Sequence, residues 1–432
     1  LPVETAEDGT EVRAGRAYVL PAGRRAGLED GRLRLNEADG VPVTAGIDHF
    51  FRSLASDRGQ GAVGVVLSGT GTDGTLGVRS IKEAGGSVFV QSPEDAGHGH
   101  MPKSAISTGQ VDVTGPAGEL VETLLEFRDN AGIIQLPDEP EALGEKGRSV
   151  LQRIFAQLHA QGGHDFSGYK RSTVLRRLER RMQFHSTSSL EAYLRLLRSD
   201  SEEVQALQED LLITVTHFFR DPQSFGALQE KILPDLFEQR GIAESVRVWV
   251  PACATGEEAY SLAIQLLEEA GRADVSPSLQ LFATDVSTGA IAQAREGLYP
   301  ESIEADVSEE RLGRFFKKEG EYYRVSSRLR EMVVFANHDL LTDPPFSELD
   351  LVSCRNLLIY LRPEMQRRVL RRVHYGLRDG GHLFLGRSES IGQQDSLYSV
   401  VDKSHNLLQA QALPDEQPAL LPSPRQRSSW GQ

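Results

Sequence analysis

The chain has only two cysteines, Cys253 and Cys354, in 432 residues. Two are too few for a disulfide framework or a cysteine-based zinc site, which favours a reducing, cytoplasmic compartment. No apolar run is long enough to span a bilayer, and no signal peptide is recognisable. We therefore expect a protein of the cytoplasm that binds no structural metal.

Positive charge is also scarce, because 47 Lys and Arg residues face 62 Asp and Glu residues, giving a formal net charge of −15. This balance argues against a nucleic-acid partner for the whole protein. The length predicts about three domains at ~150 residues each. We expect an α/β unit over 1–127, a linker over 128–147, a helical unit over 148–225, a second α/β unit over 226–412 and a disordered tail over 413–432.

One stretch, residues 245–260, organises the second α/β unit. It reads S-V-R-V-W-V-P-A-C-A-T-G-E-E-A-Y, a β-branched strand, a turn of small residues and a helix that opens with Glu257 and Glu258. Carboxylates in a first helical turn suit the helix dipole but repel phosphate, so we expect a ligand that carries a cation, such as a sulfonium or an amine. This turn also lacks a G-x-G-x-x-G fingerprint, which disfavours a nicotinamide dehydrogenase.

The next strand, 279–284, ends at Asp285. A carboxylate in this position accepts hydrogen bonds from ribose hydroxyls in doubly wound folds. The alternative is a βαβ unit with an unremarkable acidic loop. Further strands at 333–336, 349–354 and 382–385 predict a mostly parallel, doubly wound sheet, interrupted over 301–334 by a small antiparallel insertion.

The helical unit contains a basic helix, 170–184, with six Lys and Arg residues and a single Glu179. Such a run is usually a solvated face, but it can also dock an acidic protein surface. The span 214–221 that follows reads T-V-T-H-F-F-R-D. Its structural interpretation is a helix entry packed by Phe218 and Phe219, and its chemical interpretation is a hydroxyl and guanidinium pair that faces a ligand.

The first α/β unit carries the motifs E-D-G-x-x-V-R-A-G-R-A-Y-V-L-P, A-V-G-V-V-L-S-G-T-G-T-D-G, I-K-E-A-G-G and M-P-K-S-A-I. Together they resemble the catalytic domain of chemotaxis protein-glutamate methylesterases, the CheB family. The resemblance implies that Asp73 is the triad aspartate and that the serine and histidine would precede Leu1. We interpret His98 and His100 as a solvated loop pair, and we expect no esterase activity from these residues alone.

The remainder carries D-F-S-G-Y-K-R-S-T-V-L-R-R-L-E-R-R-M, T-V-T-H-F-F-R-D, A-T-G-E-E-A-Y-S and S-C-R-N-L-L-I-Y-L, in that order. These motifs resemble chemotaxis receptor methyltransferases, the CheR family, over about 148–410. The whole layout is similar to fused methylesterase–methyltransferase proteins. The resemblance implies an S-adenosylmethionine-dependent methyltransferase fold, with S-adenosylmethionine as methyl donor and receptor glutamates as acceptors. Because of its positive charge, we expect the basic helix 170–184 to be the receptor contact.

Site residues follow from the same resemblance. Thr216 and Arg220 lie at the methionyl end of the donor and the acceptor, and Arg220 orients the acceptor carboxylate. Thr214 and Asp339 stand where the family commonly has asparagine, and both keep a hydrogen-bond acceptor. The remaining roles are Glu257 for the donor ammonium, Asp285 for its ribose, Asp339 and Leu340 for its adenine, and Arg355, Asn356 and Tyr360 for the acceptor side.

Two other readings stay open. A receptor-binding scaffold without activity would need a broken donor site. A bifunctional methyltransferase and methylesterase depends on an upstream segment.

Overall fold

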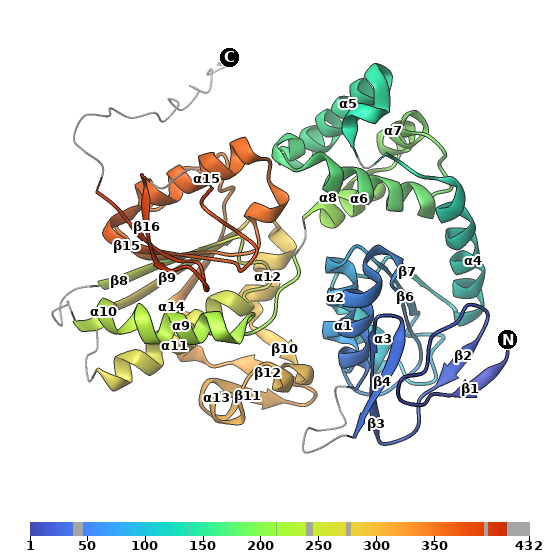
Figure 1. Cartoon of the computed structure of the whole chain (residues 1–432), viewed down its shortest axis with the longest axis horizontal. Coiled ribbons are helices and arrows are strands. Elements are labelled where there is room, and N and C mark those ends of the chain that lie inside the picture. Colours follow the sequence, from blue (N-terminus) through green and yellow to red (C-terminus); the bar gives the residue numbers. More distant parts are fainter. Residues whose placement is uncertain are drawn as a thin grey trace, which may run out of the picture.

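The computed structural model describes residues 1–37, 46–137, 139–212, 214–238, 245–273, 278–392 and 396–412. The chain forms three neighbouring domains (Figure 1): an N-terminal domain (residues 1–127), a helical domain (144–212) and a C-terminal domain (214–412). The tail expected to be disordered, 413–432, lies outside the described residues. Among the described helices, none combines the length and apolarity needed to cross a membrane.

The N-terminal domain is built on a parallel sheet of order β5-β6-β7, as the βαβ pattern predicts. Every residue of the middle strand is buried. One buried cluster around this sheet consists of residues of the domain itself, among them Phe51, Ile81 and Val88. The elements are β1 (Val3–Thr5), β2 (Ala17–Val19), β3 (Arg24–Glu29), β4 (Arg32–Glu37), α1 (Gly46–Arg58), η2 (Gly59–Gly61), β5 (Val63–Val66), α2 (Thr75–Glu83), β6 (Ser87–Gln91), α3 (His100–Ser107), β7 (Val113–Gly115) and α4 (Ala117–Ile133).

The segment expected to be a linker, 128–147, is helical at both ends. Helix α4 continues to Ile133, and α5 begins at Gly144. The ring of Phe127 stacks on Phe184 of the helical domain with centroids 4.6 Å apart, which fixes this end of α4. Helix α4 ends before Pro137, which lacks the backbone N–H needed to continue the helix. Pro140 begins a short 3₁₀ helix that leads into α5.

The helical domain has the helices that the periodicity predicts. Ser189 accepts a hydrogen bond from the Ala192 amide at the start of α7. Asp200 caps α8 by accepting from two amides in its first turn. Such caps satisfy N–H groups that have no partner within the helix. The elements are η3 (Pro140–Leu143), α5 (Gly144–Gly162), η4 (Phe166–Gly168), α6 (Arg171–Phe184), α7 (Leu190–Ser199) and α8 (Ser201–Leu211).

The C-terminal domain contains the doubly wound sheet, of order β13-β9-β8-β14-β15-β17-β16. Its first five strands are parallel to one another, β17 pairs antiparallel with β15, and β16 pairs antiparallel with β17. The strands are β8 (Ser245–Pro251), β9 (Ser278–Asp285), β13 (Val333–Asn337), β14 (Leu349–Cys354), β15 (Leu377–Leu385), β16 (Tyr398–Asp402) and β17 (Leu407–Ala410). The helices are α9 (Pro222–Lys231), α10 (Leu233–Glu238), α11 (Glu257–Arg272), α12 (Thr288–Glu296), α13 (Glu309–Phe315), α14 (Ser327–Met332), η6 (Leu358–Tyr360) and α15 (Pro363–Gly376).

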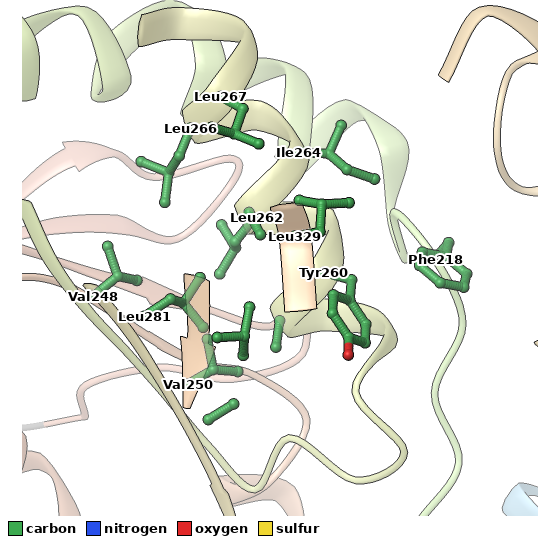
Figure 2. Close-up of a cluster of buried hydrophobic side chains, with 14 of the residues drawn as sticks. Phe218, Val248, Val250, Tyr260, Leu262, Ile264, Leu266, Leu267, Leu281 and Leu329 are labelled. Atoms are coloured by element: carbon green, nitrogen blue, oxygen red, sulfur yellow. The ribbon is translucent and has the colours of Figure 1, made fainter. Parts of the chain in front are cut away.

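Helix α11 packs on this sheet through its apolar face. Figure 2 shows Leu262 of α11 facing Val248 and Val250 of β8, with Tyr260 near Leu329. Phe218 belongs to the same buried cluster. The span 214–225, expected to close the helical unit, therefore packs with the C-terminal domain, because its aromatic side chains are buried there.

The predicted antiparallel insertion is present as a sheet of order β10-β12-β11. It follows α12 and precedes β13, so it interrupts the strand–helix alternation at the expected place. Its elements are β10 (Leu298–Pro300), η5 (Glu301–Ala305), β11 (Phe316–Glu319) and β12 (Tyr322–Val325).

Candidate functional site

The carboxyl ends of β8, β9 and β14 surround a cavity of about 70 Å³. Strand order reverses here, since β8 lies between β9 and β14, and open α/β sheets bind ligands at such a point. Seven of the predicted site residues line the cavity: Thr214, Thr216, Arg220, Asp285, Arg355, Asn356 and Tyr360.

The turn after β8 gives the cavity its floor. Ala252 and Ala254 adopt left-handed backbone angles, with φ of 55° and 48°, which non-glycine residues rarely do. The Ala254 amide donates to Asp285 Oδ2 at 2.9 Å, and the Ser287 amide donates to Oδ1 at 2.8 Å. Burial raises the pKa of Asp285, and these amides counteract the rise. The carboxylate is thereby fixed in orientation at the cavity and keeps lone pairs for a ligand hydroxyl.

The Arg355 guanidinium lines the cavity and has hydrogen-bond donors without a partner among the described residues. Its side chain has no exposed surface and lies against the rings of Phe225 and Phe384, 5.1 Å and 4.6 Å from their centroids. Nη2 donates to the Arg220 carbonyl and to Asp221 Oδ2, both at 2.8 Å. Nε and Nη1 make no hydrogen bond to any described residue. Because buried donors are normally paired, this guanidinium suits an anionic group of a ligand.

Glu258 also lines the cavity, whereas Glu257 does not. Ser353 Oγ donates to Glu258 Oε1 at 2.7 Å, and Glu258 Oε2 lies 3.6 Å from Arg355 Nη1. Burial raises the pKa of Glu258, although Arg355 acts in the opposite direction. The sequence motif predicts that Glu257, the first glutamate of the pair, contacts the donor ammonium. Neighbouring residues of a helix point in different directions, and only the structure shows which one faces the cavity.

Glu257 is engaged elsewhere. Its Oε2 accepts from Thr255 Oγ1 at 2.6 Å, and its Oε1 accepts from Arg79 Nη1 of α2 at 2.5 Å.

The predicted adenine residues, Asp339 and Leu340, are outside the cavity lining. Asp339 Oδ2 lies 3.1 Å from His164 Nδ1, and its Oδ1 accepts from the Leu341 amide at 2.8 Å. Burial favours a higher pKa for Asp339, but the His164 contact outweighs it and the pKa is lowered. Leu340 packs in the core shared with the helical domain. His164 Nε2 also lies 3.2 Å from the hydroxyl of Tyr169, which lines the cavity, so Asp339 lies one contact behind the lining.

Residues of the N-terminal domain close one side of the site. Arg220 Nη1 donates to the Val215 carbonyl at 3.2 Å, and Nη2 pairs with Glu83 of α2. Thr214 Oγ1 accepts from Gln110 Nε2 at 3.1 Å. Burial, with the charge of Glu83 adding to it, raises the pKa of Tyr360 to about 12, so its hydroxyl stays protonated at neutral pH.

Asp73 lies apart from this cavity. Its two carboxylate oxygens accept from the Ile47 and Asp48 amides, each at 2.9 Å, at the start of α1. His98 is exposed, and His100 Nδ1 lies 3.2 Å from Glu321 Oε2 of the C-terminal domain. Asp73 thus serves the N-terminus of a helix in this structure, and its triad role stays a prediction.

Comparisons with known proteins agree with this architecture. Residues 214–407 match the family model of the CheR methyltransferase SAM binding domain, and residues 149–212 match its all-alpha domain. Chemotaxis protein methyltransferase 1 of Pseudomonas aeruginosa is 31% identical over 264 residues, which are 60% of this chain and 95% of that protein. The chain belongs to the CheR methyltransferase family. The predictions of the fold and of an S-adenosylmethionine site are thereby confirmed.

The N-terminal part has its own relatives. Residues 1–124 match the CheB methylesterase model. A solved CheB methylesterase catalytic domain from Thermotoga maritima is 33% identical, covering 28% of this chain and 67% of that chain, with a TM-score of 0.27. An uncharacterized 104.1 kDa protein of Rhodobacter capsulatus is 42% identical over 429 residues. The matched region covers 95% of this chain but only 45% of the Rhodobacter capsulatus protein.

Proposed function

We propose that this protein transfers the methyl group of S-adenosylmethionine to glutamate side chains of chemoreceptors. The observation that carries the proposal is the cavity at the ends of β8, β9 and β14, where Asp285, Glu258, Arg355 and Arg220 meet in a CheR-type domain. Carboxylates and guanidinium groups there match a donor that is a zwitterion with a positively charged sulfur. The reaction places the protein in the cytoplasm, where donor and receptor tails occur.

The chemistry asks for alignment and exclusion of water. S-adenosylmethionine supplies a methyl group bonded to a positively charged sulfur. The pKa of a glutamate side chain is near 4.3, so the acceptor is already ionised at neutral pH and no general base is needed. The protein must hold the carboxylate in line with the methyl group in a site that excludes water. A protonated Tyr360 fits this task, since a hydroxyl can donate a hydrogen bond without moving a proton.

Donor binding is assigned to the cavity floor. We place the ribose hydroxyls at Asp285 and the ammonium at Glu258, with Glu257 close behind it. The free donors of Arg355, with Asn356 beside them, suit the methionyl carboxylate. Asp339 and Leu340, in the turn after β13, remain the proposed adenine residues.

Arg220 is proposed to orient the acceptor carboxylate. It lines the cavity together with Thr216 and Tyr360. In this structure the Arg220 guanidinium pairs with the Glu83 carboxylate, which supports a role in binding a glutamate side chain.

The receptor is proposed to contact the basic helix 170–184, which α6 forms. Its positive charge complements an acidic receptor surface. In this structure, Arg177, Arg180 and Arg181 are buried. Arg181 pairs with Glu203 inside the helical domain, while Arg177 and Arg180 donate to carbonyls of the N-terminal domain. Receptor contact with Arg177 and Arg180 therefore requires that the N-terminal domain move.

Transfer of labelled methyl groups from S-adenosylmethionine to the cytoplasmic fragment of a receptor tests the function. We expect base-labile label on receptor glutamates with the wild-type protein and none with Asp285→Ala. Titration of the donor by calorimetry separates the alternatives. A receptor-binding scaffold would bind the receptor fragment, would not bind S-adenosylmethionine and would transfer no methyl group. That outcome would overturn the proposal.

A methylesterase activity is the second candidate, because residues 1–124 match that family. In the described residues, the Asp73 carboxylate is bonded to amides of α1 rather than to a histidine. We therefore assign no ester hydrolysis to these residues.

A further inference from the structure

Helix α2 of the N-terminal domain lies at the methyltransferase site. Its last residue, Glu83, pairs with Arg220. Glu83 and Tyr360 both line a groove of about 770 Å³ between the N-terminal domain and α6. Glu83 and Thr216 also line a second pocket of about 110 Å³. A glutamate carboxylate on a helix thus stands beside three residues that line the donor cavity.

A second contact from the same helix reaches the donor side. Arg79 lies one helical turn before Glu83, and its Nη1 donates to Glu257 Oε1 at 2.5 Å. Only 9% of the Arg79 side chain and 2% of the Glu257 side chain are exposed. A guanidinium held against this carboxylate opposes the approach of the cationic donor.

We propose that α2 is a pseudosubstrate segment. Glu83 takes the place of the acceptor glutamate, and Arg79 neutralises the negative charge of Glu257. The inference rests on the proposed function, because Glu83 can block the acceptor site only if the acceptor glutamate binds at Arg220. The closed arrangement is then an inhibited state. A receptor helix gains access to Arg220 only by displacing Glu83.

On α1 and α3, which flank α2, the N-terminal domain makes polar contacts with the C-terminal domain. Ser104 Oγ lies 3.2 Å from Tyr322 Oη, and Gln293 Nε2 donates to the Ser107 carbonyl at 3.0 Å. Arg52 pairs with Asp306 at 3.4 Å. Interfaces of this polar kind resemble transient protein–protein contacts. The buried cluster around Phe51, Ile81 and Val88 is made of residues of the N-terminal domain, so it stays intact when the domain separates from the site.

A group of buried charges sets the balance toward the closed state. Lys82, next to Glu83, contacts Asp210 of the helical domain at 3.0 Å, and Arg180 contacts the same carboxylate at 2.5 Å. These pairs are shielded from salt more than surface pairs are. The closed state therefore persists at physiological ionic strength until a partner competes for Arg220.

The test compares receptor methylation by the full chain and its variants. Glu83→Gln removes the charge that engages Arg220 and keeps the shape of the side chain. We expect kcat/KM for the receptor fragment to rise roughly three- to tenfold, because a larger fraction of molecules is competent. Glu122→Gln, an exposed change on α4, is the matched control and should leave it unchanged. Glu83→Ala serves as the second variant should Glu83→Gln fold poorly.

Arg79→Gln tests the donor side by calorimetry with S-adenosylmethionine. We expect tighter donor binding than in the wild type, whereas Arg58→Gln, a half-exposed control at the end of α1, should match the wild type. Equal methylation by the wild type and Glu83→Gln would overturn the inference. Label found on Glu83 itself would also overturn it, since Glu83 would then be a substrate.

The two proposals fail in different ways. If the wild type binds the donor and methylates the fragment but the Glu83 and Arg79 variants change nothing, only the pseudosubstrate role is wrong. If no variant binds the donor, the methyltransferase function fails and the inference fails with it.

Discussion

The Arg79 guanidinium of the N-terminal domain hydrogen-bonds the Glu257 carboxylate of the C-terminal domain, with 2.5 Å between Nη1 and Oε1. Both side chains are buried, so the pair is held in a medium where a charge without a partner is costly. Glu257 begins α11, directly after the turn that forms the floor of the donor cavity. The contact therefore joins the two family-related parts of the chain at the place where the chemistry is expected.

Arg220→Ala should reduce turnover more than donor binding. Its guanidinium is proposed to orient the acceptor, an interaction that matters most in the transition state. We expect a loss of roughly a hundredfold in kcat, of the size seen when one charged catalytic donor is removed. Steady-state methylation and calorimetry measure the two quantities. Equal losses in both would reject the orienting role.

Arg355→Met should weaken both folding and donor binding. The change leaves Glu258 buried without its cationic neighbour and removes the free donors at the cavity. We expect a loss of about 3 kcal/mol in the free energy of unfolding, typical of breaking a buried pair. Chemical denaturation provides the measurement. Arg387→Met, at an exposed position, is the control and should leave stability nearly unchanged.

Asp48→Asn should remove a pH dependence of stability. Burial raises the pKa of Asp48 from 3.8 to about 7. Between these values the folded protein binds more protons than the unfolded chain, so stability falls as pH rises through this window. The amide cannot ionise, and Asn Oδ1 can still accept from the Gly77 amide, which donates to Asp48 Oδ1 at 2.6 Å.

Thermal unfolding from pH 4 to pH 8 checks the Asp48 prediction. The variant should be more stable than the wild type at pH 8, and the difference should shrink toward pH 4. The exposed change Asp129→Asn should not alter the profile. A wild-type profile that is flat over this range and unaffected by Asp48→Asn would contradict the raised pKa.

Lys82→Met should destabilise the junction between the N-terminal and helical domains. The Lys82 ammonium contacts Asp112 at 2.6 Å and Asp210 at 3.0 Å. Burial opposes ionisation of Asp210, but Arg180 and Lys82 outweigh it and hold its pKa well below the usual range. Losing one cation from this buried group should lower the free energy of unfolding by about 3 kcal/mol.

Lys103→Met, an exposed change on α3, is the control for Lys82→Met. Hydrogen exchange adds a local readout: amides of α2 and α6 should lose protection first. If only global stability changed, and these amides kept their protection, the junction would not depend on Lys82.

Much of the architecture was predictable from the sequence because periodicity reports burial. The β-branched run at Val246–Val250 became a central strand, and the spacing of Val174 and Leu178 became the buried face of α6. Asp285 was found by its position at a strand end, since parallel strands bring their carboxyl ends to one edge.

The rest depends on contacts between distant residues. The choice between Glu257 and Glu258 depends on the direction of one helical turn. The contact of Asp339 with His164, which is far away in sequence, could not be predicted from either segment. No local sequence pattern predicts the ion pair between Glu83 and Arg220, because an ion pair between two domains produces no periodicity in either segment.

The arginines of α6 give the closed arrangement an electrical consequence. The whole chain carries a formal charge of −15 and repels an acidic body at long range. Arg177 and Arg180 donate to carbonyls of the N-terminal domain and are hidden from solvent. Separation of the domains would add Arg177 and Arg180 to the accessible basic surface of α6, so the positive charge that this face presents depends on whether the domains are closed.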